Sequence, residues 1–437
     1  MRYSRNSLAR KCIFSILDHN MQFDLFFSIS QCPIDNQMPS EKQIWQNFFR
    51  QIRAADEMGF QRAWIAESHL SSQAQKKHKN AVIPHWQGEV GLNTDILQLA
   101  RTVYASTKNI ELGSAIMNLL TNGGPIAHAE RVATFLSQQE AIEDERKLHI
   151  GYSAGRFDFM SRTLGLKPRN KVESLFWPAF KNQAFSEASE IFLRLLNKEE
   201  FCSDDIAIRY LDKRHFKSPE EWKKFSKMVA SKEELTSYPV EKFYEFENTK
   251  VVPQEFSADL LNLTIGSHNP QLQDEANQIM PVKVFNLSIT PDKQIEETHQ
   301  RMAEIYHKDG GKWERSFMPR TTFVFLNNEK GLSAKEQEEK ARDKAKKALS
   351  AYWQAMTGTI DDGKIENATD NALVGNVESI KAQIQERFHP DDCLMLWFDF
   401  FNNNADEVIE DMHTFSEFIA PKFDDKNWNS RVEFVQR

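Results

Sequence analysis

The chain has 437 residues, of which 40% are apolar and 27% are charged. This composition excludes a disordered chain and a fibrous repeat, because it supplies enough apolar side chains for a large core. The formal net charge is −8. We therefore expect no nucleic-acid partner, since no basic block offsets the acidic balance.

The four cysteines, Cys12, Cys32, Cys202 and Cys393, stand too far apart in the sequence to form a metal-binding or redox pair. No apolar run approaches the roughly 18 residues that a membrane span needs. Residues 1–20 lack the long apolar run of a secretory signal. We expect a cytoplasmic protein with free thiols and no membrane contact. Residues 1–20 are predicted to be a disordered tail, and Met1 or Met21 is the start.

Short β-rich runs alternate with longer amphipathic patterns along the chain, which predicts eight strands, each followed by a helix. The predicted strands are 23–29, 60–66, 110–118, 148–153, 260–265, 282–289, 321–326 and 392–398. The predicted helices are 41–58, 94–106, 125–143, 171–196, 270–280, 292–307, 333–356, 377–388 and 405–419.

Eight successive βα units favour an α/β fold of the closed (β/α)8 TIM barrel type. An open dinucleotide-binding sheet would carry a glycine-rich turn after its first strand, and residues 28–33 contain no glycine. Residues 199–258 interrupt the alternation with ten aromatic residues, too many for a flexible linker. We predict a barrel over 21–423, an ordered insertion at 199–258 between the fourth helix and the fifth strand, and a C-terminal tail at 424–437.

A carboxylate and an imidazole follow the second predicted strand, as Glu67 and His69. In a barrel, the functional residues lie at the carboxyl ends of the strands. A carboxylate–imidazole pair at that position can hold or transfer a proton near neutral pH. The spacing also allows a surface histidine and a structural glutamate. We take Glu67 and His69 as candidate catalytic residues.

Asn118 ends the third predicted strand, and the turn text Asn122-Gly123-Gly124-Pro125 follows it. An amide at a strand end can hydrogen-bond a bound heterocycle. A turn-capping role for Asn118 is the alternative, because the text after it is ordinary turn chemistry.

Ser153 lies in the segment 151–155, which fits the G-x-S-x-G nucleophile elbow of the α/β-hydrolases. That elbow needs a helix directly after it, and the sequence predicts only a poor helix over 156–165. In a barrel, the small residues would instead let a ligand approach the backbone, and Arg156 could pair with a phosphate. A serine hydrolase that uses Ser153 stays as an outside alternative.

Gly266, Ser267 and His268 follow the fifth predicted strand and open a helix at Pro270. The start of a helix offers backbone N–H groups and a positive dipole end to a phosphate. An ordinary N-cap by serine or Asn269 is the alternative. No H-E-x-x-H or C-x-x-C text occurs, so no metal site is predicted.

Several segments resemble one family, in the same order. Residues 56–69 (DEMGFQRAWIAESH) are similar to the E-x-x-G-F-x-x-x-W-x-x-E-H-H segment of the bacterial luciferase-like, flavin-dependent monooxygenases. Further segments resemble that family's third strand (110–115), its N-P-x-x-x-A-E helix start (125–130), its G-R-x-x-x-G strand (146–151) and its G-T-P-E-x-V text (374–380). The resemblance covers 21–423 apart from the insertion.

The resemblance implies a (β/α)8 barrel that binds reduced FMN at the carboxyl ends of its strands. The flavin then reacts with O2 to a peroxyflavin, which oxidises an aldehyde, alkane, sulfonate or similar small molecule. A flavin reductase as a partner and a homodimer are implied as well. The flavin phosphate is expected near 153–156 and 266–268. A non-prolyl cis peptide is expected at Ala115–Ile116, which makes both residues candidates for cofactor contact.

The chain departs from the family pattern at two positions. Ser68 stands where the family has the first histidine of its E-H-H text, and only the second histidine matches, as His69. Ala154 stands at the position of the luciferase arginine after the fourth strand, with Arg156 two residues later. Light emission is therefore not expected, and the phosphate contact would have to be rebuilt from Arg156.

The resemblance leaves alternatives open for the function. A deazaflavin-dependent oxidoreductase would use the same barrel, and Ser68 is compatible with a non-catalytic flavin-binding paralogue. Oxygen activation on a flavin needs a dry, covered site. The insertion at 199–258, as a lid, and the loop at 71–91 are the candidate covers. The sequence does not identify the substrate.

Overall fold

The computed structural model describes residues 20–34, 37–77, 83–156, 158–230 and 235–424, together with Trp428 and Arg431. The predicted N-terminal tail up to residue 19, with Cys12, lies outside the described residues, as does most of the segment 424–437. Trp428 is nonetheless part of the core. It is 1% exposed, and its ring centroid lies 5.1 Å from that of Phe60.

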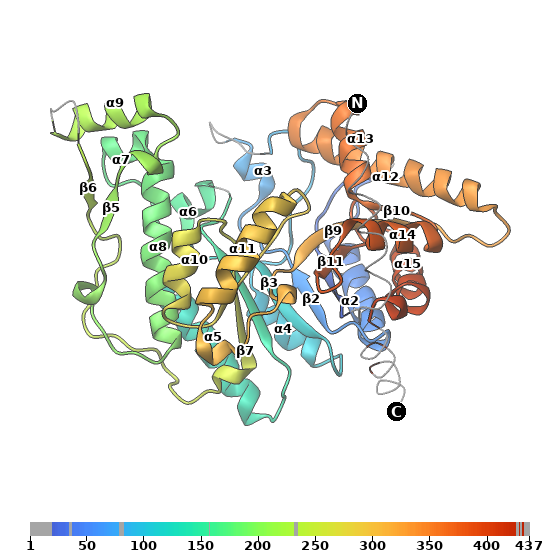
Figure 1. Ribbon diagram of the computed structural model, residues 1–437, viewed down its shortest axis with the longest axis horizontal. Coiled ribbons are helices and arrows are strands. Elements are labelled where there is room, and N and C mark those ends of the chain that lie inside the picture. The colour runs from blue at the N-terminus through green and yellow to red at the C-terminus, as the bar shows by residue number, and fades with distance from the viewer. Residues whose placement is uncertain are drawn as a thin grey trace.

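A parallel nine-stranded sheet forms the centre of the molecule, in the order β10-β9-β11-β1-β2-β3-β4-β7-β8 (Figure 1). Its strands are β1 (Gln22–Phe27), β2 (Arg62–Ile65), β3 (Glu111–Asn118), β4 (Leu148–Ser153), β7 (Leu261–Ile265), β8 (Val282–Val284), β9 (Arg320–Leu326), β10 (Leu373–Gly375) and β11 (Cys393–Trp397). The sheet curls until β8 and β9 approach each other. Asn286 pairs with Arg320 in a parallel bridge, and its N–H donates to the carbonyl of Pro319 at 2.9 Å. The prediction of an α/β fold is confirmed. In place of the eight-stranded closed barrel that was predicted, the described residues form a curled parallel sheet of nine strands.

The helices that connect these strands begin at the capping residues that the sequence offers. Ser40, Asp95 and Asn376 each accept a hydrogen bond from the first turn of the helix that follows. The helices are α2 (Glu41–Glu57), α3 (Ser72–Gln75), α4 (Ile96–Tyr104), α5 (Gly124–Ala141), α6 (Asp158–Leu164), α7 (Lys171–Leu175), α8 (Trp177–Leu196), α9 (Pro219–Ala230), α10 (Pro270–Asn277), α11 (Asp292–Ile305), α12 (Ala334–Thr357), α13 (Asp362–Asn371), α14 (Val377–Arg387) and α15 (Ala405–Phe418).

Four sequence predictions about these elements were wrong. The predicted helix over 171–196 breaks at Phe176 into α7 and α8, because Pro178 in the first turn of α8 cannot continue a helix. The predicted strand over 282–289 ends at Val284. The segment after Ser153 does form a helix, α6. The strand count of eight missed β10, which pairs with the end of β9, and the α13 helix before it.

The segment between α8 and β7 has structure of its own. It holds an antiparallel pair, β5 (Arg209–Leu211) with β6 (Tyr238–Val240), and the helix α9. Figure 1 shows these elements beside the upper half of α8, at the edge of the molecule. Their apolar side chains form a small separate core with Trp177 and Phe180 of α8. Glu187 of α8 anchors the return of the chain, since its carboxylate accepts the N–H of Phe243 and of Tyr244 at 3.0 Å.

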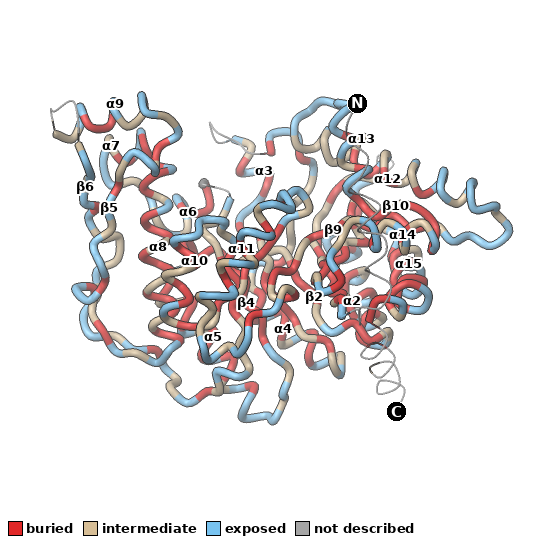
Figure 2. The backbone as a smooth tube through the Cα atoms, viewed as in Figure 1, coloured by how far each residue is buried: buried red, intermediate tan, exposed pale blue. Residues whose placement is uncertain are grey.

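The main core lies between the sheet and its helices, where Figure 2 shows the strands and the inner helix faces as buried. The interior of the curled sheet is filled by large rings set against glycines. A Cβ atom on Gly113 would lie 2.4 Å from the Trp64 ring, and one on Gly151 would lie 2.3 Å from the Phe285 ring. These glycines therefore make the space that the two aromatic side chains occupy. No helix in the described part of the chain is long and apolar enough to cross a membrane.

Candidate functional site

The carboxyl end of β2 places Glu67 and His69 in direct contact. Their atoms Oε1 and Nε2 lie 3.1 Å apart, and both side chains are almost fully buried. The loop after β3 adds a third residue, since the Asn122 amide nitrogen lies 3.1 Å from Nε2 of His69 and 3.3 Å from its Nδ1. The imidazole is thus held between a carboxylate and an amide.

Burial raises the pKa of Glu67, while its hydrogen bond to His69 acts in the opposite direction. The Glu67 carboxylate also accepts the N–H of Ile96 at the start of α4, at 3.4 Å. These contacts agree with the alternative interpretation of Glu67, a structural glutamate that is bound to a neighbouring segment. The same contacts fix the orientation of the His69 ring, so the group can hold a proton at a defined position.

Ser68, at the position where a family histidine was expected, is buried and 7% exposed. Its N–H donates to the carbonyl of Asn93 at 2.9 Å. A Cβ atom on Gly91 would lie 3.2 Å from the Cβ of Ser68. Gly91 therefore packs directly against the position, and a larger side chain at residue 68 would require the backbone at Gly91 to move.

Four of the predicted cofactor residues meet at the ends of β3, β4 and β7. The peptide bond Ala115–Ile116 is cis, as predicted. A Cβ atom on Gly266 would lie 2.4 Å from Cδ1 of Ile116 and 3.4 Å from Cβ of Ser153. The backbone of residue 266 thus passes close to both side chains, and a side chain at this position would displace the end of the Ile116 side chain.

Asn118, at the end of β3, is buried and lies against this group. Its side-chain oxygen Oδ1 accepts the N–H of Leu120 at 3.0 Å. This contact is the turn-capping role that the sequence also allowed. Its amide nitrogen has no hydrogen-bond partner among the described residues. A buried donor without a partner is costly, so this amide is available to a bound molecule.

The segment after β7 behaves largely as an ordinary helix start. The N–H of Gly266 is already used by the carbonyl of Tyr152, at 2.9 Å. Asn269 caps α10 by accepting the N–H of Gln271, and Ser267 accepts the N–H of Asn269. His268 is exposed. Among the described residues of this segment, only the N–H groups of Ser267 and His268 remain available for the predicted contact with a phosphate.

Arg156 lines a different part of the same face. It is exposed, and it borders a cavity of about 190 Å³ that lies against the carboxyl ends of β1, β2 and β11. Its wall includes the aromatic residues Phe26, Trp86, Tyr352, Trp397, Phe400 and Phe401. Asp399 is the carboxylate in this wall, and burial raises its pKa to about 7. The cavity thus combines aromatic side chains with one arginine, one carboxyl group and several uncharged polar side chains.

Comparison with known proteins agrees with this arrangement. A family model described as luciferase-like monooxygenase matches residues 21–139. The crystal structure of the monooxygenase RslO1 from Streptomyces bottropensis aligns with 92% of this chain and 100% of its own, at 16% identity and a TM-score of 0.62. This confirms the resemblance to the luciferase-like monooxygenases. No curated protein matches the chain.

Two further solved structures share the luciferase-like fold. The oxygenating constituent of 3,6-diketocamphane monooxygenase from Pseudomonas putida, solved with FMN, is 16% identical, with a TM-score of 0.56 over 92% of this chain and 99% of its own. The long-chain alkane monooxygenase LadA is 12% identical, with a TM-score of 0.57 over 95% and 96%. Identities this low establish the fold of this chain alone, and the chemistry is argued from its residues.

The sequence did not single out several residues of the candidate site. Asn122 was interpreted as part of a turn, although it contacts His69. Asp399, Trp397 and Tyr352 were not singled out, because the cavity arises where α12 packs against the loop after β11. A signal was present in the text Trp397-Phe-Asp-Phe-Phe401, which places one acidic residue among four aromatic residues at a strand end.

Ser153 has a local role that does not require a nucleophile. Its hydroxyl accepts the N–H of Gly155 at 3.1 Å, and the carbonyl of Gly155 accepts a hydrogen bond from Lys181 at 2.8 Å. No hydrogen bond joins Ser153 to a histidine in the described part of the chain. The helix α6 that a hydrolase elbow needs is present, but the base is not, so the luciferase-like interpretation is the stronger one.

Proposed function

We propose that this protein is a monooxygenase that uses reduced FMN and O2 to oxidise a small organic molecule. The observation that carries the proposal is the group at the ends of β3, β4 and β7. There the Ile116 side chain, the exposed backbone of Gly266 that packs against it, and the unpartnered amide of Asn118 beside Ser153 lie at neighbouring strand ends. Such a group offers a flat apolar contact and one directed hydrogen-bond donor.

The residues present fit a flavin. Ile116 and Gly266 would lie against the ring system, and the Asn118 amide would donate to one of its acceptors. Ser153 and the backbone of Ser267 and His268 would face the phosphate, with Arg156 as its cationic partner. The bound reduced flavin would supply the electrons that activate O2.

The chain's own residues would orient and protect the reacting molecules. His69, held by Glu67 and Asn122, would keep a proton at a fixed ring nitrogen. The aromatic cavity beside Arg156 would take an apolar substrate and exclude water, which limits wasteful release of hydrogen peroxide. The side chain of Tyr244 reaches the Gly123–Gly124 turn next to Asn122, since a Cβ atom added to Gly124 would lie 3.0 Å from the Tyr244 ring. We propose that the segment 199–258 covers the site through this contact.

A flavin-binding protein without oxygenase turnover is the second candidate, and it is favoured by Ser68. That residue is buried beneath the loop at 71–91 and cannot shuttle a proton as an imidazole does. A deazaflavin in place of FMN, a flavin reductase partner and a homodimer stay predictions.

Rapid mixing of the reduced-FMN complex with O2 tests the proposal. The protein is mixed with O2 alone and with a panel of aldehydes, alkanes and sulfonates, and product is counted against hydrogen peroxide. We expect one class of substrate to raise product at the expense of peroxide. Flavin binding with peroxide as the sole product for every substrate would support the second candidate, and no binding of FMN would contradict both.

Arg156→Ala should weaken the binding of FMN by about tenfold, the effect expected for one charge-assisted contact to phosphate. Riboflavin, which lacks the phosphate, should bind the variant as it binds the natural protein. Fluorescence quenching of both ligands measures the two dissociation constants. Lys171→Ala, at the outer helix α7, serves as a control for a general loss of positive charge. Equal losses for FMN and riboflavin would show that Arg156 contacts something other than phosphate.

His69→Gln should lower turnover by about 100-fold, the lower range for loss of a general acid–base group. Glutamine keeps a donor towards Glu67, so the affinity for FMN should change by less than about threefold. Product formation and FMN titration are measured on the same preparation. His413→Gln, which replaces an exposed histidine on α15, should behave as the natural protein. Unchanged turnover in the first variant would make His69 a structural residue.

A further inference from the structure

A second cavity lies at the opposite end of the sheet from the site described above. It has a volume of about 740 Å³ and opens at the amino ends of β2, β3, β4, β7 and β8. In barrels of this kind, this face normally serves stability and is packed with branched apolar residues. Here its floor is formed by Arg62, His149 and Lys283, so the position of the charges needs an explanation.

Most of the charges around this cavity neutralise one another. Nε of Arg62 lies 3.0 Å from both carboxylate oxygens of Asp24. Nε2 of His149 lies 2.7 Å from the carboxylate of Glu111. Arg431, at the edge, is paired with Asp424. Because these pairs are closed, they leave no strong contact for a ligand.

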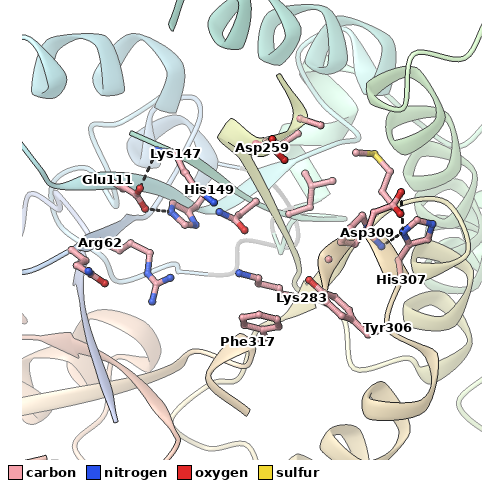
Figure 3. A pocket seen from close by; sticks show the side chains of 18 of the residues that line it. Arg62, Glu111, Lys147, His149, Asp259, Lys283, Tyr306, His307, Asp309 and Phe317 are labelled. Carbon is pink, nitrogen blue, oxygen red and sulfur yellow. Dashed lines mark hydrogen bonds and ion pairs between the residues drawn. The ribbon is translucent and has the colours of Figure 1, made fainter. Parts of the chain in front are cut away.

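Lys283 is the exception. Its ammonium lies 4.1 Å from the centre of the Phe317 ring, and it forms no ion pair with a carboxylate in the described part of the chain. Figure 3 shows its amine at the centre of the cavity, above Phe317 and between Arg62 and Tyr306. Burial, and then the positive charges of Arg62 and Lys147, lower the pKa of Lys283 to about 8. The position is therefore electropositive and lacks its counter-charge.

A second polar atom beneath this floor also lacks a partner. The Thr264 hydroxyl is fully buried and has no hydrogen-bond partner among the described residues. It borders a compartment of about 10 Å³ that Arg62, His149 and Lys283 share with the large cavity. That volume is about one water probe, so the compartment can take a single small polar group or a water molecule.

The remaining walls determine which anion would fit. They are apolar on one side, with Leu263, Met280, Tyr306 and Phe317. The unmatched charge on the floor is a single positive one, and Glu111 stands close by, so a doubly charged phosphate would meet uncompensated repulsion. We propose that this cavity is a second ligand site, which binds a small organic carboxylate with its charge on Lys283 and its apolar body against Tyr306 and Phe317.

Calorimetric titration of the full chain with sodium benzoate tests this site. Benzamide, which has the same shape without the charge, is the matched ligand. We expect benzoate to bind at least about tenfold more tightly than benzamide, and Lys283→Met to remove that difference. Equal binding of the two ligands, or no binding of either, would overturn the proposal. Competition by inorganic phosphate as strong as that by benzoate would overturn the choice of a carboxylate.

Two control variants separate this cavity from its surroundings. Lys335→Met removes an exposed cation of α12 that does not border this cavity, and Arg156→Ala removes the cation at the opposite face of the sheet. Each should change benzoate binding by less than about twofold. A loss with Arg156→Ala but not with Lys283→Met would place the ligand at the other cavity and refute the site proposed here.

A labelling experiment on the natural protein does not depend on how the variants fold. A lysine with a lowered pKa reacts faster with an acylating reagent, because more of it is the free amine. Acetylation at pH 8, followed by mass spectrometry, should modify Lys283 readily. Benzoate should slow that reaction at least about fivefold and leave the labelling of exposed lysines unchanged. The absence of protection would count against the site.

Discussion

Asp24→Ala is expected to lower the free energy of unfolding by about 3–5 kcal/mol, because it leaves a buried guanidinium without its counter-charge. The Asp24 carboxylate lies inside the sheet with 2% of its side chain exposed. It accepts hydrogen bonds from Nε of Arg62 at 3.0 Å and from Nε1 of Trp64 at 2.8 Å. Urea unfolding followed by circular dichroism measures the loss.

A matched exposed pair shows whether burial is the reason. Arg50 and Asp406 form an ion pair between α2 and α15 in which 48% and 79% of the side chains are exposed. Asp406→Ala should cost less than about 1 kcal/mol, since water solvates the arginine that remains. In addition, Arg62→Met in the Asp24→Ala background should recover part of the loss, because it removes the unpaired charge. A loss of similar size at both carboxylates would contradict this account.

The location of most strands could be predicted because their signal is local. Runs such as 23–27, which is apolar apart from Asp24, and 393–397 are largely buried, and β-rich segments separated by helices predict a parallel sheet. Prediction of strands from the sequence failed where a strand was short. β10 has three residues, too few for any periodicity, and its pairing with β9 is a matter of tertiary structure. The break at Phe176 had a local signal in Pro178, which the apolar spacing of the surrounding residues outweighed.

The site was predicted to a similar extent. Glu67 and His69 were predicted at the end of the second strand, and the structure places them in contact. Asn118 lies at the end of the third strand, as expected. The roles of all three residues stay predictions. Asn122 was missed because the sequence Asn122-Gly123-Gly124-Pro125 is typical of a turn. The same residue can stand in a turn and also contact His69. The unpaired charge of Lys283 had no signal at all. It depends on which carboxylates reach the floor of the cavity, and residues that are distant in the sequence, Asp24 and Glu111, are already taken by Arg62 and His149.

Asp399→Asn is expected to change how stability depends on pH. Burial raises the pKa of Asp399 from 3.8 to about 7, so the folded protein holds a proton there that the unfolded chain has lost. The stability from this group is complete below about pH 4, falls as the pH rises towards 7, and is constant above. The variant has no such proton. Its stability relative to the natural protein should therefore rise by about 3 kcal/mol between pH 5 and pH 8.

Urea unfolding of both proteins at pH 5 and at pH 8 measures this difference in stability. Asp406→Asn is the exposed control, and its stability relative to the natural protein should be the same at both pH values.

The result bears on the function because the pKa shift of Asp399 depends on a dry cavity. Cys32 shares the cavity wall, and burial, followed by the charge of Asp399, raises its pKa to about 12, so its thiol stays neutral throughout the range. If water entered the cavity freely, it would solvate the Asp399 carboxylate, and the difference between pH 5 and pH 8 would vanish. That outcome would contradict a water-excluding substrate pocket, whereas the expected rise would support one.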